Sequence, residues 1–211
     1  MNYRQSLITA AILLLFALVG TAMVAYTYDN TRERIAENER ATLLRKLHKL
    51  IPPESHDNVL LQDTLKVQNQ TLLGSAEPVT VYRARLHGEP VSLVIEAVAP
   101  DGYSGTIRLL VGINIDGSLS GVRVVGHRET PGLGDAIEED RSDWILGFTG
   151  KSLQDPPLQQ WAVKKDGGAF DQLTGATITP RAVVKAVRQA LLYYREHKEA
   201  LLAPGETTDQ P

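Results

Sequence analysis

The sequence of 211 residues contains no cysteine, so disulfide bonds, thiolate zinc sites and cysteine-ligated iron–sulfur clusters are excluded. It also lacks a surplus of charge, because 22 Lys and Arg stand against 25 Asp and Glu, for a formal net charge of −3. Without a basic surplus, the charge gives no reason to expect nucleic acid as a partner. The glycine fingerprint of dinucleotide-binding folds follows none of the predicted strands. No metal site is predicted either.

The first positive feature is an apolar stretch near the N-terminus. Residues 7–28 contain no charged side chain, and about 20 residues of helix cross the hydrocarbon core of a bilayer. A cleaved signal peptide is the alternative, but its apolar core is usually only about 7–15 residues long. Tyr26 and Tyr28 close the stretch as an interfacial belt would. We therefore predict a short head at residues 1–6 and an uncleaved transmembrane anchor at residues 7–28.

The charges beside the anchor hardly indicate its orientation. Arg4 precedes the apolar stretch, whereas Asp29, Arg32, Glu33 and Arg34 follow it, so the positive-inside rule is almost silent. An anchor with a short head and a long following domain usually leaves that domain outside the cytoplasm. We therefore expect the domain on the outer side of the membrane.

A charged amphipathic segment follows the anchor. Apolar side chains recur at helical spacing among Arg, Glu and Lys, at Ile35, Leu43, Leu44, Leu47 and Leu50. Pro52 and Pro53 should end the helix, because proline cannot continue one. We interpret residues 29–53 as a helical stalk. That this segment is simply the first helix of the domain remains an equal alternative.

The remaining chain predicts one α+β domain at residues 54–203, with antiparallel strands and flanking helices. Strands are expected at residues 79–86 and 91–99 around a turn at 87–90, and at 106–115 and 119–125 around Asp116-Gly117, a strong hairpin signal. Residues 135–148 have a helical pattern. The last helix should begin at Pro180 with Thr179 as N-cap. Residues 204–211 are polar and predicted to be disordered.

The sequence of that last helix predicts one buried apolar stripe and one charged face. Its apolar residues at helical spacing are Val183, Val187, Ala190, Leu191 and Tyr194. The opposite face carries Arg181, Lys185, Arg188 and Arg195. A 43% hydrophobic chain can bury one core of this kind, so one domain with appendages is expected.

Two short segments stand out against this background. Residues 126–134, Gly-His-Arg-Glu-Thr-Pro-Gly-Leu-Gly, follow a predicted strand, and their glycines let backbone amides approach a flat ligand. Residues 171–179, Asp-Gln-Leu-Thr-Gly-Ala-Thr-Ile-Thr, precede the last helix, whose N-terminus suits a phosphate. Each has a structural alternative: the first is an ordinary turn, and in the second Thr177 and Thr179 only cap the helix.

Residues 171–179 resemble the D-x-x-[ST]-G-A-T-x-[ST] motif of the FMN-binding domain family. That family includes the G subunit of the Rnf (Rsx) electron-transport complex and the C subunit of the sodium-pumping NADH:quinone reductase. Residues 129–134, Glu-Thr-Pro-Gly-Leu-Gly, resemble its second motif, and Gly102-Tyr103-Ser104-Gly105 resembles its G-[YF]-x-G segment. The three motifs occur in the family's order. The compact length is more similar to the Rnf protein than to the quinone reductase protein.

The resemblance implies FMN bound covalently, as a phosphoester of Thr177. It implies further cofactor-binding residues, namely Thr174, Gly175, Ala176, Glu129, Thr130, Pro131, Gly132, Leu133 and Gly134. A hydroxyl is a weak nucleophile without a base, and the sequence offers only Asp171 nearby, so a separate flavin transferase is expected. Its recognition sequence would comprise Asp171, Thr174, Gly175, Ala176, Thr177 and Thr179. No residue of this chain is expected to be catalytic.

By the same resemblance, the protein would carry electrons as a single-pass component of an ion-translocating oxidoreductase complex in the bacterial inner membrane. Its partners would be the other subunits, which move electrons between ferredoxin and NADH, and its FMN domain would be periplasmic. Three alternatives remain: a component like the C subunit of the quinone reductase, a membrane-anchored flavin-dependent regulatory module, and a self-contained flavin enzyme. His127 is the loop residue that an enzyme would use, although a structural role is the commoner one for such a histidine.

Overall fold

The computed structural model describes residues 3–203 of the chain. The regular elements are α1 (Tyr3–Leu50), β1 (Thr64–Val67), α2 (Gln70–Leu73), β2 (Val79–Leu86), β3 (Glu89–Gly102), β4 (Gly105–Asn114), β5 (Leu119–Gly126) and α3 (Ile178–Leu202). Five 3₁₀ segments lie between them: η1 (Pro53–Ser55), η2 (Gly134–Ile137), η3 (Asp143–Phe148), η4 (Leu158–Gln160) and η5 (Lys164–Asp166). The tail predicted at residues 204–211 lies outside the described residues, as do residues 1 and 2 of the predicted head.

The N-terminal helix is one continuous element. α1 is long and apolar enough to cross a membrane, and it runs through residue 29 without a break. The chain divides into two compact units, Met1–Leu44 and Arg45–Pro211, so the last turn of α1 belongs to the domain. The helix ends at Leu50, immediately before the prolines, as expected. Residues 29–50 of the predicted stalk are therefore helical, and the last turn of this helix is also the first element of the domain.

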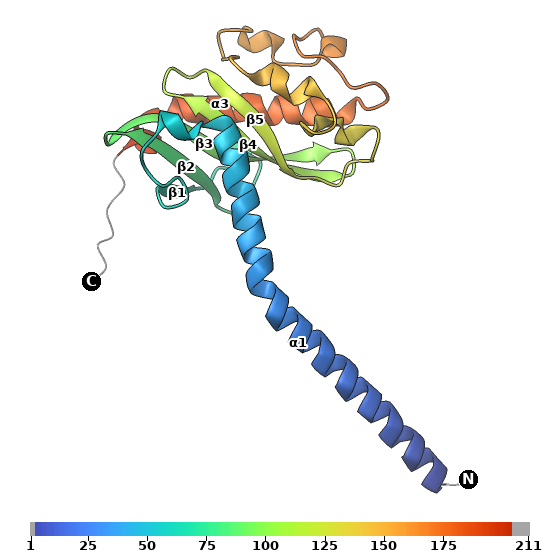
Figure 1. The fold of residues 1–211 in the computed structure, drawn as a ribbon. Helices are drawn as coiled ribbons and strands as arrows, with labels where there is room; N and C mark the ends of the chain where they lie inside the picture. The colour runs from blue at the N-terminus through green and yellow to red at the C-terminus, as the bar shows by residue number, and fades with distance from the viewer. Residues whose placement is uncertain (1–2, 204–211) are drawn as a thin grey trace. The chain divides into compact units, whose positions relative to one another are not determined.

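The domain is built on a five-stranded antiparallel sheet in the order β1-β2-β3-β4-β5 (Figure 1). Each of the four predicted strands is present within a few residues of its expected bounds. The turn between β2 and β3 is tighter than expected: His87 and Gly88 both have positive φ, 54° and 84°, and Glu89 already pairs with Leu86. The α+β prediction is confirmed, whereas the short elements β1 and α2 were not predicted.

One face of the sheet carries the main core. α3 runs along this face (Figure 1), and its predicted apolar stripe is fully buried. Inward-facing residues of β2, β3 and β4 complete the core, including Val81, Ile95, Ile107 and Val111. The alternation of buried residues along the strands sends their neighbours to the opposite face.

The opposite face receives the last turn of α1. Leu50 lies so close to the sheet that a Cβ on Gly112 would come within 3.1 Å of the Leu50 Cβ. The ammonium of Lys46 donates to the Val124 carbonyl oxygen at 2.7 Å, and Lys49 pairs with Glu139 at 2.7 Å. The turn is therefore held by packing against bare backbone and by two polar contacts.

The prediction of a helix at residues 135–148 is wrong. Two 3₁₀ segments, η2 and η3, occupy that stretch, and Glu138 between them is extended. The Ser142 hydroxyl donates to the Ala136 carbonyl and accepts the Trp144 amide, so it competes with helical hydrogen bonds. Packing of aromatic rings then sets the path of the chain, with Phe148 stacked on Phe170 at a centroid distance of 4.7 Å.

Candidate functional site

A cavity of about 480 Å³ opens at the N-terminus of α3. Three segments far apart in the sequence form its walls: the β3–β4 turn, the loop after β5 and the segment that leads into α3. The lining residues are Tyr103, Glu129, Thr130, Leu133, Gly134, Gly175, Ala176, Thr177, Ile178 and Thr179. Each of the three motifs thus contributes to one site, which neither their spacing nor their composition could establish.

The segment before α3 forms a tight turn beside the cavity. The Ala176 amide donates to the Leu173 carbonyl oxygen at 3.1 Å, and Gly175 has φ 79°. A positive φ at the third position is what a type II turn requires, and glycine adopts it without strain. A Cβ on Gly175 would also come within 2.9 Å of Leu133 Cδ2. Glycine is therefore needed here both for conformation and for contact with the neighbouring loop.

Thr177 immediately follows this turn and occupies the N-cap position of α3. Its side chain makes no capping hydrogen bond, although N-cap threonines usually do so. Pro180, within the first turn, has no N–H, so Thr177, Ile178 and Thr179 carry the amides that a helix leaves unpaired at this end. Thr177 thus lines the cavity, and its hydroxyl makes no capping bond to the amides at this end of the helix.

Thr179 does not have its predicted role as the N-cap. α3 begins at Ile178, one residue earlier than Thr179, and the buried Thr179 hydroxyl donates to Glu129 Oε2 at 2.5 Å. The expectation was wrong because Glu129, fifty residues distant, offers this hydroxyl a carboxylate acceptor. Neither threonine caps the helix with its side chain. The alternative that Thr177 and Thr179 only cap the helix therefore does not hold.

Residues 129–134 form a compact loop around one carbonyl. The Thr130 carbonyl oxygen accepts the amides of Leu133 and Gly134, both at 3.1 Å, and Gly132 has φ 77°. Thr130, Leu133 and Gly134 reach the cavity, as does Glu129, which is only 4% exposed. Pro131 and Gly132, also predicted to bind the cofactor, shape the turn but do not line the cavity.

Asp171 and Thr174 lie in the same segment but outside the cavity lining. The Asp171 carboxylate is paired with the Lys164 ammonium at 2.5 Å, and its carbonyl oxygen accepts the Trp144 indole N–H at 2.7 Å. Both Asp171 and Thr174 are exposed. Exposure suits contact with an external protein better than contact with a ligand in the cavity.

His127 is held by its own loop. Its Nδ1 accepts the Glu129 amide at 3.0 Å, which places the proton on Nε2, 3.1 Å from the Glu138 carboxylate. Both ring nitrogens are thereby engaged with protein groups, and His127 does not line the cavity. This arrangement agrees with the structural role expected for it.

Two lining residues, Tyr103 and Ile178, were not among the cofactor-binding residues expected from the sequence. Tyr103 lies within the Gly102-Tyr103-Ser104-Gly105 motif and is 68% exposed, so the motif itself was the available signal. Ile178 occupies a variable position of its motif and offered none. With Leu133, these residues place one exposed apolar side chain from each segment around the cavity.

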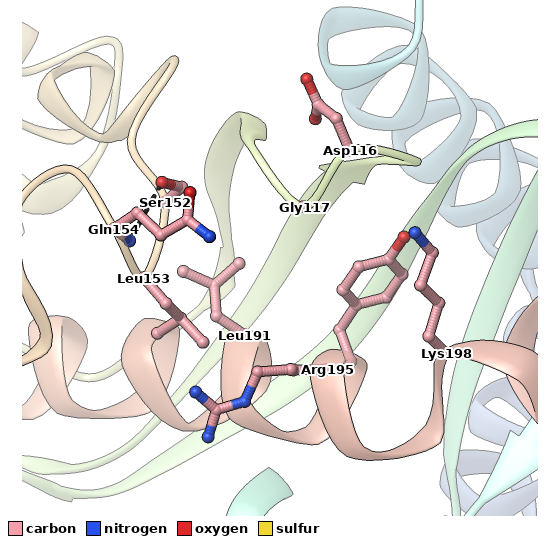
Figure 2. Close-up of a pocket in the computed structure, with 9 residues that line it drawn as sticks. Asp116, Gly117, Ser152, Leu153, Gln154, Leu191, Arg195 and Lys198 are labelled. Carbon is pink, nitrogen blue, oxygen red and sulfur yellow. Dashed lines mark hydrogen bonds between the residues drawn. The ribbon is translucent and has the colours of Figure 1, made fainter.

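A second cavity of about 190 Å³ lies at the other end of the domain's helix. Figure 2 shows it between α3, the β4–β5 turn and the loop at Ser152. The Tyr194 hydroxyl and the Lys198 ammonium both donate to the Ile115 carbonyl oxygen, at 3.0 and 2.7 Å. These polar groups thus serve the fold, and no residue of the three motifs lines this cavity.

The cavity at the N-terminus of α3 fits the size and chemistry of FMN. Its volume lies within the about 300–1,000 Å³ usual for small-molecule sites. Amide donors at the N-terminus of α3 suit a phosphate, and the apolar side chains of Tyr103, Leu133 and Ile178 suit a flat aromatic ring. No Lys or Arg is among the described residues that line the cavity, so the phosphate charge would depend on the helix N-terminus.

Comparison with known proteins agrees with this geometry. Residues 102–192 match the FMN-binding domain, and residues 1–50 match the RnfG N-terminal region. The fold and the site thus define a protein with an FMN-binding domain that follows an N-terminal apolar helix.

Three relatives, each described as the G subunit of an ion-translocating oxidoreductase complex, identify the family. The chain is 53% identical over 204 residues to that of Pseudomonas aeruginosa (strain UCBPP-PA14), covering 96% of this chain and 95% of the relative. It is 52% identical to that of Pseudoalteromonas atlantica, covering 91% and 89%, and 49% identical to that of Shewanella loihica, covering 94% of each. The chain belongs to the family formed by the G subunits of ion-translocating oxidoreductase complexes.

Proposed function

We propose that this chain is the electron-carrying G subunit of a membrane-bound ion-translocating oxidoreductase complex, with FMN joined through a phosphoester to Thr177. The observation that carries the proposal is the convergence of three motifs on one cavity, with Thr177 on its wall and the Thr177 hydroxyl free of a capping bond. When bound, FMN supplies a centre that takes up and releases electrons, while the protein sets its potential through hydrogen bonds and burial.

The attachment is a transfer reaction carried out by a separate flavin transferase. The Thr177 Oγ1 attacks the FMN phosphorus of FAD, so the Oγ1–P bond forms and the pyrophosphate P–O bond breaks. AMP leaves, and the hydroxyl proton passes to a base of the transferase. Among the described residues, the two carboxylates nearest this segment are both engaged: Asp171 is paired with Lys164, and Glu129 accepts hydrogen bonds from Ser104 and Thr179. The exposed Asp171 and Thr174 are suited to recognition by the transferase, together with Gly175, Ala176 and Thr177. Thr179, also expected in the recognition sequence, is buried and would act through its hydrogen bond to Glu129.

The electrostatics of the cavity favour a covalent bond. Free FMN carries a phosphate monoester with about −1.5 to −2 charges near neutral pH, and the described residues that line the cavity include no Lys or Arg to balance them. Esterification to Thr177 leaves a diester with a single charge, which the amides at the start of α3 can meet. The tether also replaces dilution into bulk solvent by a local concentration of about millimolar or more.

The cofactor-binding residues divide into two groups. Gly175, Ala176 and Thr177 would hold the phosphate end. Tyr103, Leu133 and Ile178 would contact the ring, with the loop of Thr130, Pro131, Gly132 and Gly134 leaving one ring edge accessible for electron exchange. We expect the helix at residues 7–28 to anchor the protein in the bacterial inner membrane, with the domain on the periplasmic side beside the other subunits of the complex.

The test is the mass of the full-length chain, produced with and without the flavin transferase. With the transferase, the chain should gain the mass of FMN less one water and fluoresce in a denaturing gel. Thr177→Ala should gain neither, whereas Thr106→Val, an exposed substitution on β4, should gain both. Flavin bound covalently to Thr177→Ala would refute the assignment.

A second measurement separates an electron carrier from a self-contained enzyme. The purified, flavin-loaded chain should be reduced and reoxidised by stepwise electron titration, yet show no turnover with NADH and a small-molecule acceptor. The reason is that Glu129, the one carboxylate among the described residues that line the cavity, is engaged in hydrogen bonds. Steady turnover by the isolated chain would favour the enzyme instead.

A further inference from the structure

The carboxylate of Glu129 joins the three segments that make the cavity. It extends from the loop after β5, is 4% exposed, and has a partner in each of the other two segments. Oε1 accepts the Ser104 amide of the β3–β4 turn at 3.0 Å. Oε2 accepts the Thr179 hydroxyl of α3 at 2.5 Å. A buried carboxylate is stable only when such donors compensate for lost water.

Two glycines make room for this carboxylate. A Cβ on Gly102 would come within 2.9 Å of Glu129 Oε1, and a Cβ on Gly134 within 2.8 Å of Oε2. Gly102 belongs to the β3–β4 turn and Gly134 to the same loop as Glu129. Both motifs therefore contain a glycine where a larger residue would displace the carboxylate from its partners.

We propose that Glu129 is a positioning residue, which sets the distance between the three cavity walls and thereby holds the Thr177 hydroxyl in place for flavin attachment. Thr179, its partner, lies two residues after Thr177 in the first turn of α3. Because the acceptor segment enters this turn directly, the bond between Glu129 and Thr179 restrains the acceptor. The inference rests on the proposed function. In it, Glu129 holds the three protein segments in place and does not itself contact the flavin ring.

Two substitutions at Glu129 separate geometry from charge. In Glu129→Gln the amide oxygen can still accept from Ser104, and the NH₂ group can donate to the Thr179 oxygen, because a hydroxyl accepts as well as donates. Glu129→Ala loses both bonds. Thr179→Val keeps the side-chain size but removes the hydroxyl. A positioning role therefore requires Gln to restore what Ala loses.

The first experiment measures the rate of flavin loading of the full-length chain by purified transferase and FAD. We expect a fall of at least about tenfold for Glu129→Ala and for Thr179→Val, with Glu129→Gln within about threefold of the unchanged chain. Glu89→Ala and Thr106→Val, both at exposed positions, are the matched controls. Trp161→Phe, which loosens the core away from the cavity, tests whether lost stability alone slows loading.

The second experiment needs no flavin. In the Thr177→Ala background, Glu129→Ala should accelerate hydrogen exchange at the Ser104 amide, which loses its acceptor, and Glu129→Gln should not. This readout distinguishes the two proposals, because it reports on the Glu129 bridge even if the chain proves to carry no FMN.

The outcomes are distinct. Normal loading and unchanged exchange in Glu129→Ala would overturn the positioning role while leaving Thr177 as the acceptor. Equal losses in Glu129→Ala, Glu129→Gln and Trp161→Phe would also overturn it, because they would reflect stability or charge. An unchanged chain that never gains flavin would refute the proposed function by itself.

Discussion

The residues of the acceptor segment have different environments, although they form one continuous motif. Thr177 lines the cavity, Thr179 is buried against Glu129, and Asp171 faces outward towards Lys164. The segment is attached to the core at its start, where the Trp144 indole donates to the Asp171 carbonyl oxygen. A residue outside all three motifs therefore helps to set the path of the acceptor segment.

At this scale we predict the effect of Trp144→Phe on the full-length chain. The ring remains, but the indole N–H is lost, so the free energy of unfolding should fall by about 1 kcal/mol. Flavin loading should slow by about fivefold, because the start of the acceptor segment is less restrained. Urea unfolding and the loading assay measure the two effects.

Trp161→Phe is the control for that prediction. The Trp161 indole donates to the carbonyl oxygens of Ser152 and Pro156, so the same substitution removes comparable bonds in the same aromatic cluster. It does not touch Asp171. Stability should fall, yet loading should remain close to normal. Equal slowing in both variants would contradict the role of Trp144.

At the scale of elements, the attachment of the last turn of α1 to the sheet can be tested. Glu139, beyond β5, binds Lys49 of this turn at 2.7 Å and Arg123 of β5 at 3.1 Å. Burial alone would raise the pKa of Glu139, but the hydrogen bond from Lys49 and the charge of Arg123 outweigh it. The pKa therefore lies below its ordinary value of 4.5.

The sign of this shift predicts how the attachment depends on pH. A carboxyl whose pKa is lower in the folded state stabilises the fold above its unfolded pKa, and this contribution is lost as the pH falls through the folded pKa. Near neutral pH, Glu139→Gln should lower the free energy of unfolding by about 0.3–1 kcal/mol. The difference should shrink below pH 4.5, as measured by urea unfolding across a pH series. A difference that is constant down to acid pH would argue against the contribution of Glu139.

The elements also show where the local sequence pattern was sufficient to predict secondary structure. β2 to β5 are rich in apolar and β-branched residues and are separated by turns with glycine, so their positions can be predicted from short stretches of sequence. β1 has only four residues, too few for alternation to be distinctive. Residues 134–170 contain little regular structure because contacts among Phe148, Trp161 and Phe170 decide their path, and such contacts have no local period.

At the scale of the whole molecule, the absence of cysteine makes the topology directly testable. We predict that a single Gln159→Cys, at an exposed site of the domain, reacts with a membrane-impermeant maleimide in spheroplasts. Tyr3→Cys, before the anchor and also exposed, should react only after detergent is added. These results would follow from a short cytoplasmic head and a periplasmic domain. The reverse pattern would place the domain in the cytoplasm, and labelling is read by the shift in mass.

Properties that depend on residues close together in the sequence were determined by the sequence itself. The apolar helix, strands β2 to β5 and the buried stripe of α3 follow from composition and period. The candidate acceptor Thr177 follows from the resemblance of a short motif to that of a family. Only the tertiary structure brought the three motifs to one cavity, moved Thr179 from a cap to a partner of Glu129, and left the Thr177 hydroxyl without a capping bond. The reason is physical: a buried carboxylate takes the donors that the packed chain places beside it, and no local pattern records which donors those are.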